Sequence, residues 1–459
     1  MFFKILWNRF AFFSLLFLII QQLIVASSTF WITDLSEAVV NHGNILLYLT
    51  LFVSSLFLVY IPGIFSGYNL EKSKSKALYQ YTRHFSDKYK CLPETLSDKE
   101  FQSEKEPWLT NESSRTIEET YSVAYDSLAT GLNTLFNIIA ICIAIDSRLV
   151  IGYIASFIML PIASKYFKNK ISDAALQLQN DRKSLSQTLL SGWDNIIIGN
   201  IYNFSIWWKQ YKERWAFYNQ SSAHAVLITQ VASTTATILS LIPIAGIFLW
   251  IFFTTDEAAK LAALVATLPR QIQIIQHFEI LSTYAMHWHG TFAKLKALIA
   301  TIKTPSFDKD KFLHRIKKNE VTILMNEKSM DFESLDQFIH TITEKPTGRI
   351  TIRGKNGSGK TTLINLIKKS LGNQAYYLPT HSKLLFEKSF EESYSTGERI
   401  KAYLEELSYT LLKSEDTMRF VLLFDEWDAN LDLQNKQIIS NLLDDFSKKH
   451  CVIEISHRF

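Results

Sequence analysis

Nine consecutive residues, 354 to 362, have the composition of a loop that binds phosphate groups. Its glycines let successive backbone N–H groups turn toward one anion, and the helix that follows adds its positive N-terminal end. Lys360 is positioned to reach the β- and γ-phosphates of a nucleotide, and the Thr361 hydroxyl suits Mg²⁺. A β-like run precedes the loop and a helix-like run follows it, which is the context this motif requires. The predicted phosphate-binding residues are Gly354, Asn356, Gly357, Ser358, Gly359, Lys360, Thr361 and Thr362.

A second pair of residues, Asp425 and Glu426, ends an apolar run over 419–424. In combination with the phosphate-binding loop, this pattern predicts that Asp425 holds Mg²⁺ and that Glu426 polarises an attacking water molecule. Taken alone, an apolar run that ends in two carboxylates could also be an ordinary strand end. The loop upstream favours the catalytic interpretation, with ATP and Mg²⁺ as cofactors.

Three short motifs give a resemblance to the ATP-binding cassette (ABC) family. Tyr-Ser-Thr-Gly-Glu-Arg at 394–399 resembles the family's signature sequence, Ala-Asn-Leu-Asp at 429–432 resembles its D-loop, and Ile-Ser-His-Arg at 455–458 resembles its switch histidine. The resemblance covers roughly the last quarter of the chain and implies an ATPase that drives transport. It implies that ATP lies between the phosphate-binding loop of one subunit and Ser395 and Gly397 of another, close to Asp432. His457 would contact the γ-phosphate, and the working unit would be a homodimer.

The sequence departs from this family in two places. The family's glutamine after the second strand is replaced by Pro379-Thr380-His381, and only a short segment separates Thr380 from Ser395. The second departure predicts a reduced helical subdomain. The nearest aromatic residue that could stack on adenine is Phe332.

The first 300 residues contain long apolar runs, in a chain of 459 residues that is 47% hydrophobic, 13% aromatic and only 20% charged. Six runs are long enough to predict membrane spans. They cover 12–32, 45–65, 128–145, 149–167, 225–253 and 258–284. The resemblance implies that these are the six transmembrane helices of an ABC exporter.

The basic residues predict the orientation of these spans. Nine Lys and Arg residues lie between the second and third runs and seven between the fourth and fifth, whereas the other connections carry almost none. The positive-inside rule therefore predicts that both long loops, both termini and the C-terminal domain lie in the cytosol. Two turns in these loops, 108–116 and 199–204, are predicted to contact the ATPase, although they could also be ordinary helix breaks.

The last predicted span carries Arg270, Gln273 and His277 on one helical face. A charged side chain within a bilayer is costly, so these residues either face a water-filled cavity or a partner, or lie in a cytosolic extension of the helix. Both interpretations stay open from the sequence.

Two further resemblances concern the cargo. Trp427 after Glu426 resembles bacterial cyclic-peptide and siderophore exporters, and the segment 108–117 resembles SbmA/BacA-like and peroxisomal relatives. Both favour a peptide-like or lipophilic cargo.

The sequence as a whole predicts an α-helical membrane domain over 1–300, followed by a short α/β ATP-binding domain over 301–459. The predicted function is ATP-driven transport by a dimeric ABC transporter in a membrane, most simply the inner membrane of a bacterium. The alternatives are an ATP-binding membrane regulator or gate, and a membrane-tethered ATPase. A net charge of +4 gives no indication of nucleic-acid binding, and the three scattered cysteines show no metal-binding spacing.

Overall fold

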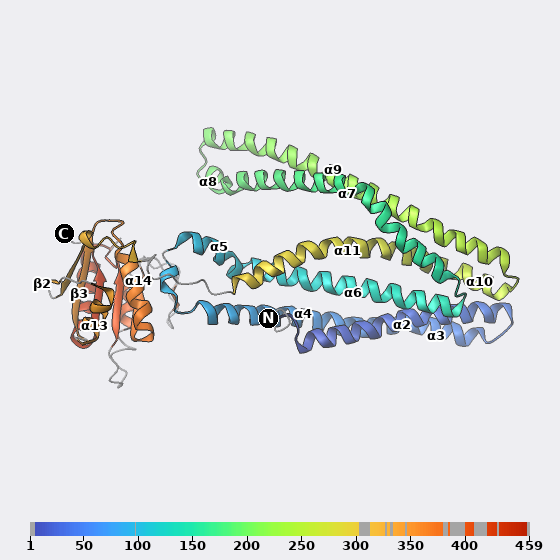
Figure 1. Ribbon diagram of the computed structural model, residues 1–459, viewed down its shortest axis with the longest axis horizontal. Helices are drawn as coiled ribbons and strands as arrows, with labels where there is room; N and C mark the ends of the chain where they lie inside the picture. Colours follow the sequence, from blue (N-terminus) through green and yellow to red (C-terminus); the bar gives the residue numbers. More distant parts are fainter. Residues whose placement is uncertain are drawn as a thin grey trace. The chain divides into compact units, whose positions relative to one another are not determined.

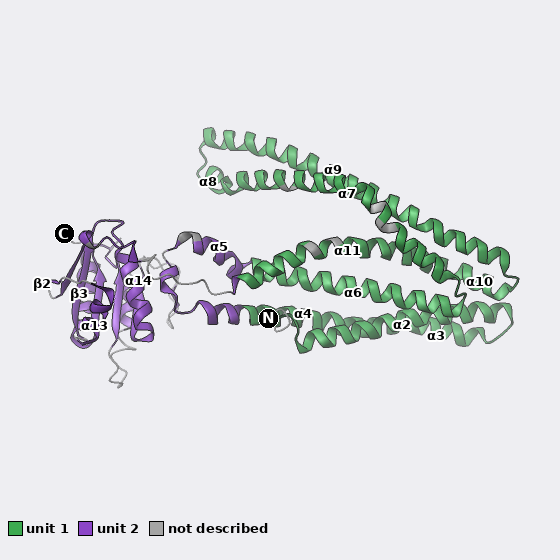
Figure 2. Cartoon of the chain, viewed as in Figure 1, with its two compact units in different colours: residues 1–81, 112–300 green, residues 82–111, 301–459 purple. Residues whose placement is uncertain are grey.

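The computed structural model describes residues 5–96, 98–302, 313–325, 328–330, 334–344, 347–379, 384–385, 400–407, 420–428 and 431–456. The chain divides into two compact units, coloured separately in Figure 2. The first comprises Met1–Tyr81 and Glu112–Ala300, and the second comprises Thr82–Asn111 and Thr301–Phe459. Residues 82–111 are thus grouped with the C-terminal residues by their contacts.

The first unit is helical. Its long helices are α2 (Arg9–Val40), α3 (Ile45–Leu58), α4 (Tyr60–Tyr89), α6 (Glu112–Ala144), α7 (Leu149–Leu190), α9 (Ile201–Thr254) and α11 (Leu268–Thr301), with the shorter α8 (Gly192–Ile197) and α10 (Ala258–Ala266) between them. Helices α4 and α11 continue into the second unit at their C-terminal ends.

Four helical stretches are long and apolar enough to cross a membrane: Arg9–Val40, Ile45–Tyr89, Glu112–Ala144 and Ile201–Thr254. The other two predicted spans fall in helices that are not among these four. Within the described residues of α7, the stretch Leu149–Met159 is a shorter apolar helix, and the run over 258–284 is divided between α10 and α11. The described residues therefore give four candidate spans where the sequence predicted six.

The helices of the first unit pack around a shared apolar core. Side chains such as Ile141 of α6, Leu149 of α7, Ile244 of α9, Leu264 of α10 and Ile274 of α11 are buried together. Helices α7 and α9 lie side by side along most of their length, and α8 joins them (Figure 1). Helix α2 packs against α3, α6 and α10.

The second unit contains a six-stranded sheet in the order β2-β1-β3-β6-β5-β4. The strands are β1 (Val321–Met325), β2 (Lys328–Met330), β3 (Gly348–Gly354), β4 (Ala375–Leu378), β5 (Val421–Asp425) and β6 (Cys451–Ile455). Strands β3, β6, β5 and β4 are parallel, while β1 pairs antiparallel with both β2 and β3.

Helices cover both faces of this sheet, as they must when parallel strands are buried on both sides. On one face Val421 and Leu423 of β5 pack with α13 (Leu335–Glu344) and α14 (Lys360–Leu371). On the other face Leu422 and Phe424 pack with α16 (Leu433–Lys449) and with the helical residues 400–407. The C-terminal unit is thus a three-layer α/β unit.

Trp427 belongs to this core. It is 4% exposed, and its indole Nε1 donates a hydrogen bond of 2.7 Å to Glu454 of β6. Arg349 of β3 donates two hydrogen bonds to the same carboxylate, at 2.9 and 2.8 Å. The tryptophan therefore ties the loop after β5 to β6, at a carboxylate that also binds Arg349 of β3.

We predict that Glu454→Gln destabilises the C-terminal unit by about 3 kcal/mol, because it removes the buried partner of Arg349. Pulse proteolysis of the full chain across a denaturant series measures this change. The matched control is Asp444→Asn, since the Asp444 carboxylate also pairs with Arg349 at 2.8 Å but is largely exposed. The control should cost less than about 1 kcal/mol, and equal losses for the two variants would contradict the prediction.

Candidate nucleotide site

The candidate site lies at the edge of the sheet where the parallel strands end. Strand β3 leads into the predicted phosphate-binding loop, β5 leads into Glu426, and β6 lies between them. Ligands of open α/β sheets bind at such an edge. A cavity of about 400 Å³ is present there, lined by Arg315, Asn356, Gly357, Gly359, Lys360, Thr361, Thr362 and Glu426.

Two glycines allow the backbone of the loop to adopt its shape. Gly357 and Gly359 have φ values of +80° and +93°, a region that L-residues with a side chain rarely adopt. A Cβ atom at Gly359 would also lie 2.6 Å from the carbonyl oxygen of Arg315. The segment before β1 thus packs directly on the loop, and Lys317 N donates a 3.0 Å hydrogen bond to Ser358 O.

Lys360 brings a positive charge into the cavity. Its residue is 5% exposed, and its ammonium donates hydrogen bonds to the carbonyl oxygens of Gly354, at 2.8 Å, and Lys355, at 3.2 Å. A buried ammonium whose hydrogen bonds go to neutral loop carbonyls fits the binding of a phosphate group, which supplies the missing negative charge.

Asp425 and Thr361 lie together beside the loop. The Thr361 hydroxyl donates to one carboxylate oxygen of Asp425 at 3.3 Å, and the Tyr377 hydroxyl donates to the other at 3.3 Å. Burial raises the pKa of Asp425 above its usual value, and the neighbouring Glu426 raises it further, while the two hydroxyl groups oppose the shift. Burial makes the negative charge of Asp425 unfavourable, and a bound cation would offset that cost. The Asp425 carboxylate and the Thr361 hydroxyl offer the oxygen ligands that Mg²⁺ prefers.

Glu426 has an unusual backbone conformation. Its φ is +48°, and it is one of three non-glycine residues with positive φ in the described part of the chain. A carboxylate residue in this conformation costs free energy of order 1–3 kcal/mol, and such strain clusters at active sites. The strain turns Glu426 out of the line of β5 and into the lining of the cavity.

The structure brings only part of the predicted site together. Ser395, Gly397 and His457 lie outside the described residues, as do Phe332, Thr380 and His381. Asp432 caps α16: its carboxylate accepts a 2.7 Å hydrogen bond from Asn435 N. It does not line the cavity in this single chain.

Two residues of the site were missed by the sequence analysis. Arg315 lines the cavity although it follows no recognisable motif, because its position depends on the packing of 313–317 against the loop. Tyr377 is the third residue of β4, and the parallel pairing of β4 with β5 brings it to Asp425. The signal available for Tyr377 was its place in the strand just before Pro379.

Helix α14, which follows the predicted phosphate-binding loop, also contacts a segment from between α4 and α5 (Lys99–Thr110). The short helix η1 (Pro93–Thr95) packs against α14, and the carboxylate of Glu94 pairs with Lys369. Glu94 is 2% exposed. The two turns predicted to contact the C-terminal domain contain helix breaks, at Asn111 and Gly199. Their predicted contact stays a prediction, and 93–95 is a further segment that packs on α14.

Comparison with protein-family models and with curated proteins gave no match for this chain. Among the described residues, no group of three or more His, Cys, Asp or Glu side chains could hold a metal ion by itself. A Mg²⁺ ion held by Thr361 and Asp425 would need further oxygen ligands, such as water or phosphate.

We predict that Asp425→Asn stabilises the nucleotide-free chain at neutral pH. Because the pKa of Asp425 is raised by folding, its contribution to stability is fully present below its ordinary pKa and is lost as the pH rises through the raised value. Asparagine has no such titration, so the melting temperature of the variant should change less between pH 4 and pH 7. Thermal unfolding of the full chain without nucleotide measures this.

The control is Asp432→Asn, in which an exposed cap residue is replaced by another good cap. It should follow the wild-type pH dependence. If Asp425→Asn and the wild type showed the same pH dependence, the burial argument for Asp425 would be wrong.

Proposed function

We propose that this chain is a membrane-embedded ABC transporter subunit that hydrolyses ATP to move a peptide-like or lipophilic cargo. The observation that carries the proposal is the cavity in which Lys360, Thr361 and the strained Glu426 meet at the end of a parallel sheet. The four long apolar helices of the first unit support a membrane location. In this proposal the chain crosses the membrane six times, forms a homodimer and places its ATP-binding domain in the cytosol.

Each residue of the cavity has a role in this proposal. The loop N–H groups and Lys360 bind the phosphates, and Thr361 with Asp425 would hold Mg²⁺. When bound, the metal ion neutralises charge that develops on the transferred phosphoryl group. Glu426 orients the attacking water molecule, because its backbone turns it into the cavity beside the loop. Ser395, Gly397 and Asp432 of a second subunit would complete the site, with His457 at the γ-phosphate.

The contact between Glu94 and Lys369 offers a route from ATP to the helices. Lys369 lies on α14, whose first turn contains Lys360 and Thr361, and Glu94 lies between the apolar helices α4 and α6. A rigid helix that carries nucleotide contacts at one end and a buried ion pair near the other transmits a change of position.

One observation favours a second candidate, an ATP-binding regulator or gate that hydrolyses little ATP. Strand β4 ends at Leu378, and the residues that follow are Pro379-Thr380-His381 rather than a segment with glutamine. The resemblance assigns to that glutamine the sensing of the γ-phosphate, so its absence favours weak turnover.

We predict that Glu426→Gln abolishes ATP turnover in proteoliposomes but retains ATP binding. The substitution removes the group that orients the water molecule and leaves Lys360 and the loop intact, so a loss of about 100-fold or more is expected. Phosphate release measures turnover, and photolabelling with an azido-ATP measures binding. The matched control is Glu405→Gln. Glu405 lies on the helical segment 400–407 and is exposed, so this variant should keep full turnover.

The two candidates give different results in this assay. Wild-type turnover that Glu426→Gln removes supports the transporter. ATP binding without turnover in both forms contradicts it and leaves the regulator.

We predict that exchanging the charges of the Glu94–Lys369 pair restores what each single change removes. Glu94→Lys or Lys369→Glu places two like charges together in a site where Glu94 is buried, so each should strongly reduce turnover in proteoliposomes. The double variant should recover a large part of it. Equal losses in the single and double variants would show that the pair has no coupling role.

A further inference from the structure

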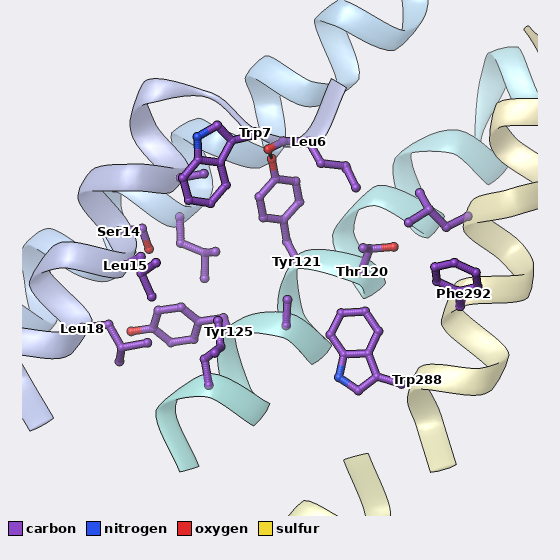
Figure 3. A pocket seen from close by; sticks show the side chains of 15 residues that line it. Leu6, Trp7, Ser14, Leu15, Leu18, Thr120, Tyr121, Tyr125, Trp288 and Phe292 are labelled. Carbon is purple, nitrogen blue, oxygen red and sulfur yellow. Dashed lines mark hydrogen bonds between the residues drawn. The ribbon is translucent and has the colours of Figure 1, made fainter. Parts of the chain in front are cut away.

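An apolar cavity of about 320 Å³ lies among four helices of the first unit. Its lining comes from α2, α4, α6 and α11 and from two residues just before α2. Three of these helices belong to the candidate membrane spans. Figure 3 shows the aromatic side chains that surround the cavity: Trp7, Tyr121, Tyr125, Trp288 and Phe292.

The lining of this cavity runs from buried to exposed residues. Leu18, Tyr121 and Leu295 are buried, whereas Trp7 is 49% exposed and Phe292 is 56% exposed. Part of the lining is therefore accessible from outside the helices, and part of it is enclosed by them. A ligand that enters from the surroundings of the helices would lose contact with those surroundings as it reaches the buried residues.

Most polar side chains of the lining are hydrogen-bonded within the protein. The Tyr121 hydroxyl donates to Leu6 O, and Tyr125 Oη lies 3.0 Å from Ser66 Oγ. The other such hydrogen bonds are donated by Ser14 to Ser66 O at 3.0 Å, by Thr120 to Thr116 O at 2.7 Å and by Trp288 to Ser127 Oγ at 3.4 Å. A polar group of a ligand would therefore lose its hydration in the cavity without gaining comparable hydrogen bonds.

The lining also lacks charge. None of the 15 described residues that line the cavity is charged. Two charged residues next to the lining in the sequence, Lys294 and Glu119, pair with each other at 2.7 Å. An ionic ligand would find no counter-ion among the lining residues, so the cavity suits an uncharged molecule.

The aromatic rings of the lining distinguish between two kinds of uncharged ligand, an acyl chain and an aromatic compound. The hydrocarbon tails of a bilayer are as apolar as leucine, so an acyl chain gains little when it leaves them for an apolar cavity. An aromatic ligand gains more, because rings that meet edge-to-face or offset-stacked attract one another beyond the burial of their area. The composition of this lining therefore favours an aromatic ligand over a lipid chain.

We propose that this cavity binds an uncharged aromatic compound of two or three fused rings. The size follows from the volume, since an apolar cavity of about 150 Å³ binds a single benzene ring and this cavity has about twice that volume. The proposal goes beyond ATP-driven transport, because it gives the first unit a ligand site of its own. Binding at this site does not depend on ATP hydrolysis.

The test uses iodonaphthyl azide, an uncharged photolabel with two fused rings that dissolves in bilayers. The purified full chain in phosphatidylcholine nanodiscs is labelled without nucleotide, and mass spectrometry maps the labelled peptides. Label should concentrate on peptides that contain 120–128 and 288–295. Excess anthracene should lower the labelling of these peptides by about fivefold or more. Tetradecane, an alkane with the same number of carbon atoms, should lower it much less at the same mole fraction in the lipid.

Two variants separate the space of the cavity from its aromatic lining. Ala124→Phe fills the cavity that Ala124 lines, so it should remove the labelling that anthracene displaces. Leu135→Phe is the matched control, because it places the same side chain at an exposed position of α6 outside the lining and should keep wild-type labelling. Phe292→Leu leaves its exposed position apolar but removes one ring, so it should lower the preference for anthracene over tetradecane by about two- to tenfold.

Tetradecane that competes as well as anthracene would overturn the proposal and show that a lipid chain fills the cavity. Label spread evenly over exposed apolar helices such as α3, or unchanged labelling in the folded Ala124→Phe variant, would overturn it as well. If Ala124→Phe does not fold by gel filtration, the competition on the wild type and on Phe292→Leu decides the question. Because the assay contains no ATP, a failure of ATP turnover leaves this result intact, and turnover without displaceable labelling overturns only the site.

Discussion

The burial of a carboxylate at the end of β5 is the constraint on which the C-terminal unit depends. All five residues of β5 are buried, and the last of them is Asp425. An anion in that position needs donors, which come from Thr361 on α14 and Tyr377 on β4. Satisfying Asp425 therefore aligns the first turn of α14 with two neighbouring strands. The same alignment brings Lys360 and Glu426 to one cavity. The packing that buries Asp425 therefore also forms the candidate site.

A second buried carboxylate, Glu454 of β6, holds the residue that follows Glu426. Glu454 of β6 accepts hydrogen bonds from Arg349, Thr351 and Trp427, and it is 3% exposed. Trp427 follows Glu426 directly, so its anchorage fixes the chain just after the strained residue. The strain at Glu426 is thus maintained by packing on both sides, as local strain at a functional site requires.

The sequence predicted the motifs better than the contacts. Loop residues such as Gly359 and Lys360 could be found because their chemistry demands fixed spacing, and the helical nature of the first unit followed from its apolar runs. The positions of Arg315 and Glu94 could not be found, since each depends on segments far apart in the sequence that meet only after folding. Tyr377 could be placed on its strand, but its contact with Asp425 could not be predicted. The hydrogen bond from Trp427 to Glu454 was likewise not predictable, because it depends on the pairing of β5 with β6. The subdomain expected between Thr380 and Ser395 lies mostly outside the described residues.

The left-handed backbone at Glu426 also bears on how this chain can evolve. Glycine and asparagine adopt such a φ at much lower cost than glutamate. A lineage released from selection for hydrolysis would gain stability by drifting to either residue, without disturbing Lys360 or the loop. Glutamate is the destabilising choice at this position and persists only under selection. Under the proposed function, the identity of residue 426 among descendants of this protein would record whether each has kept ATP hydrolysis.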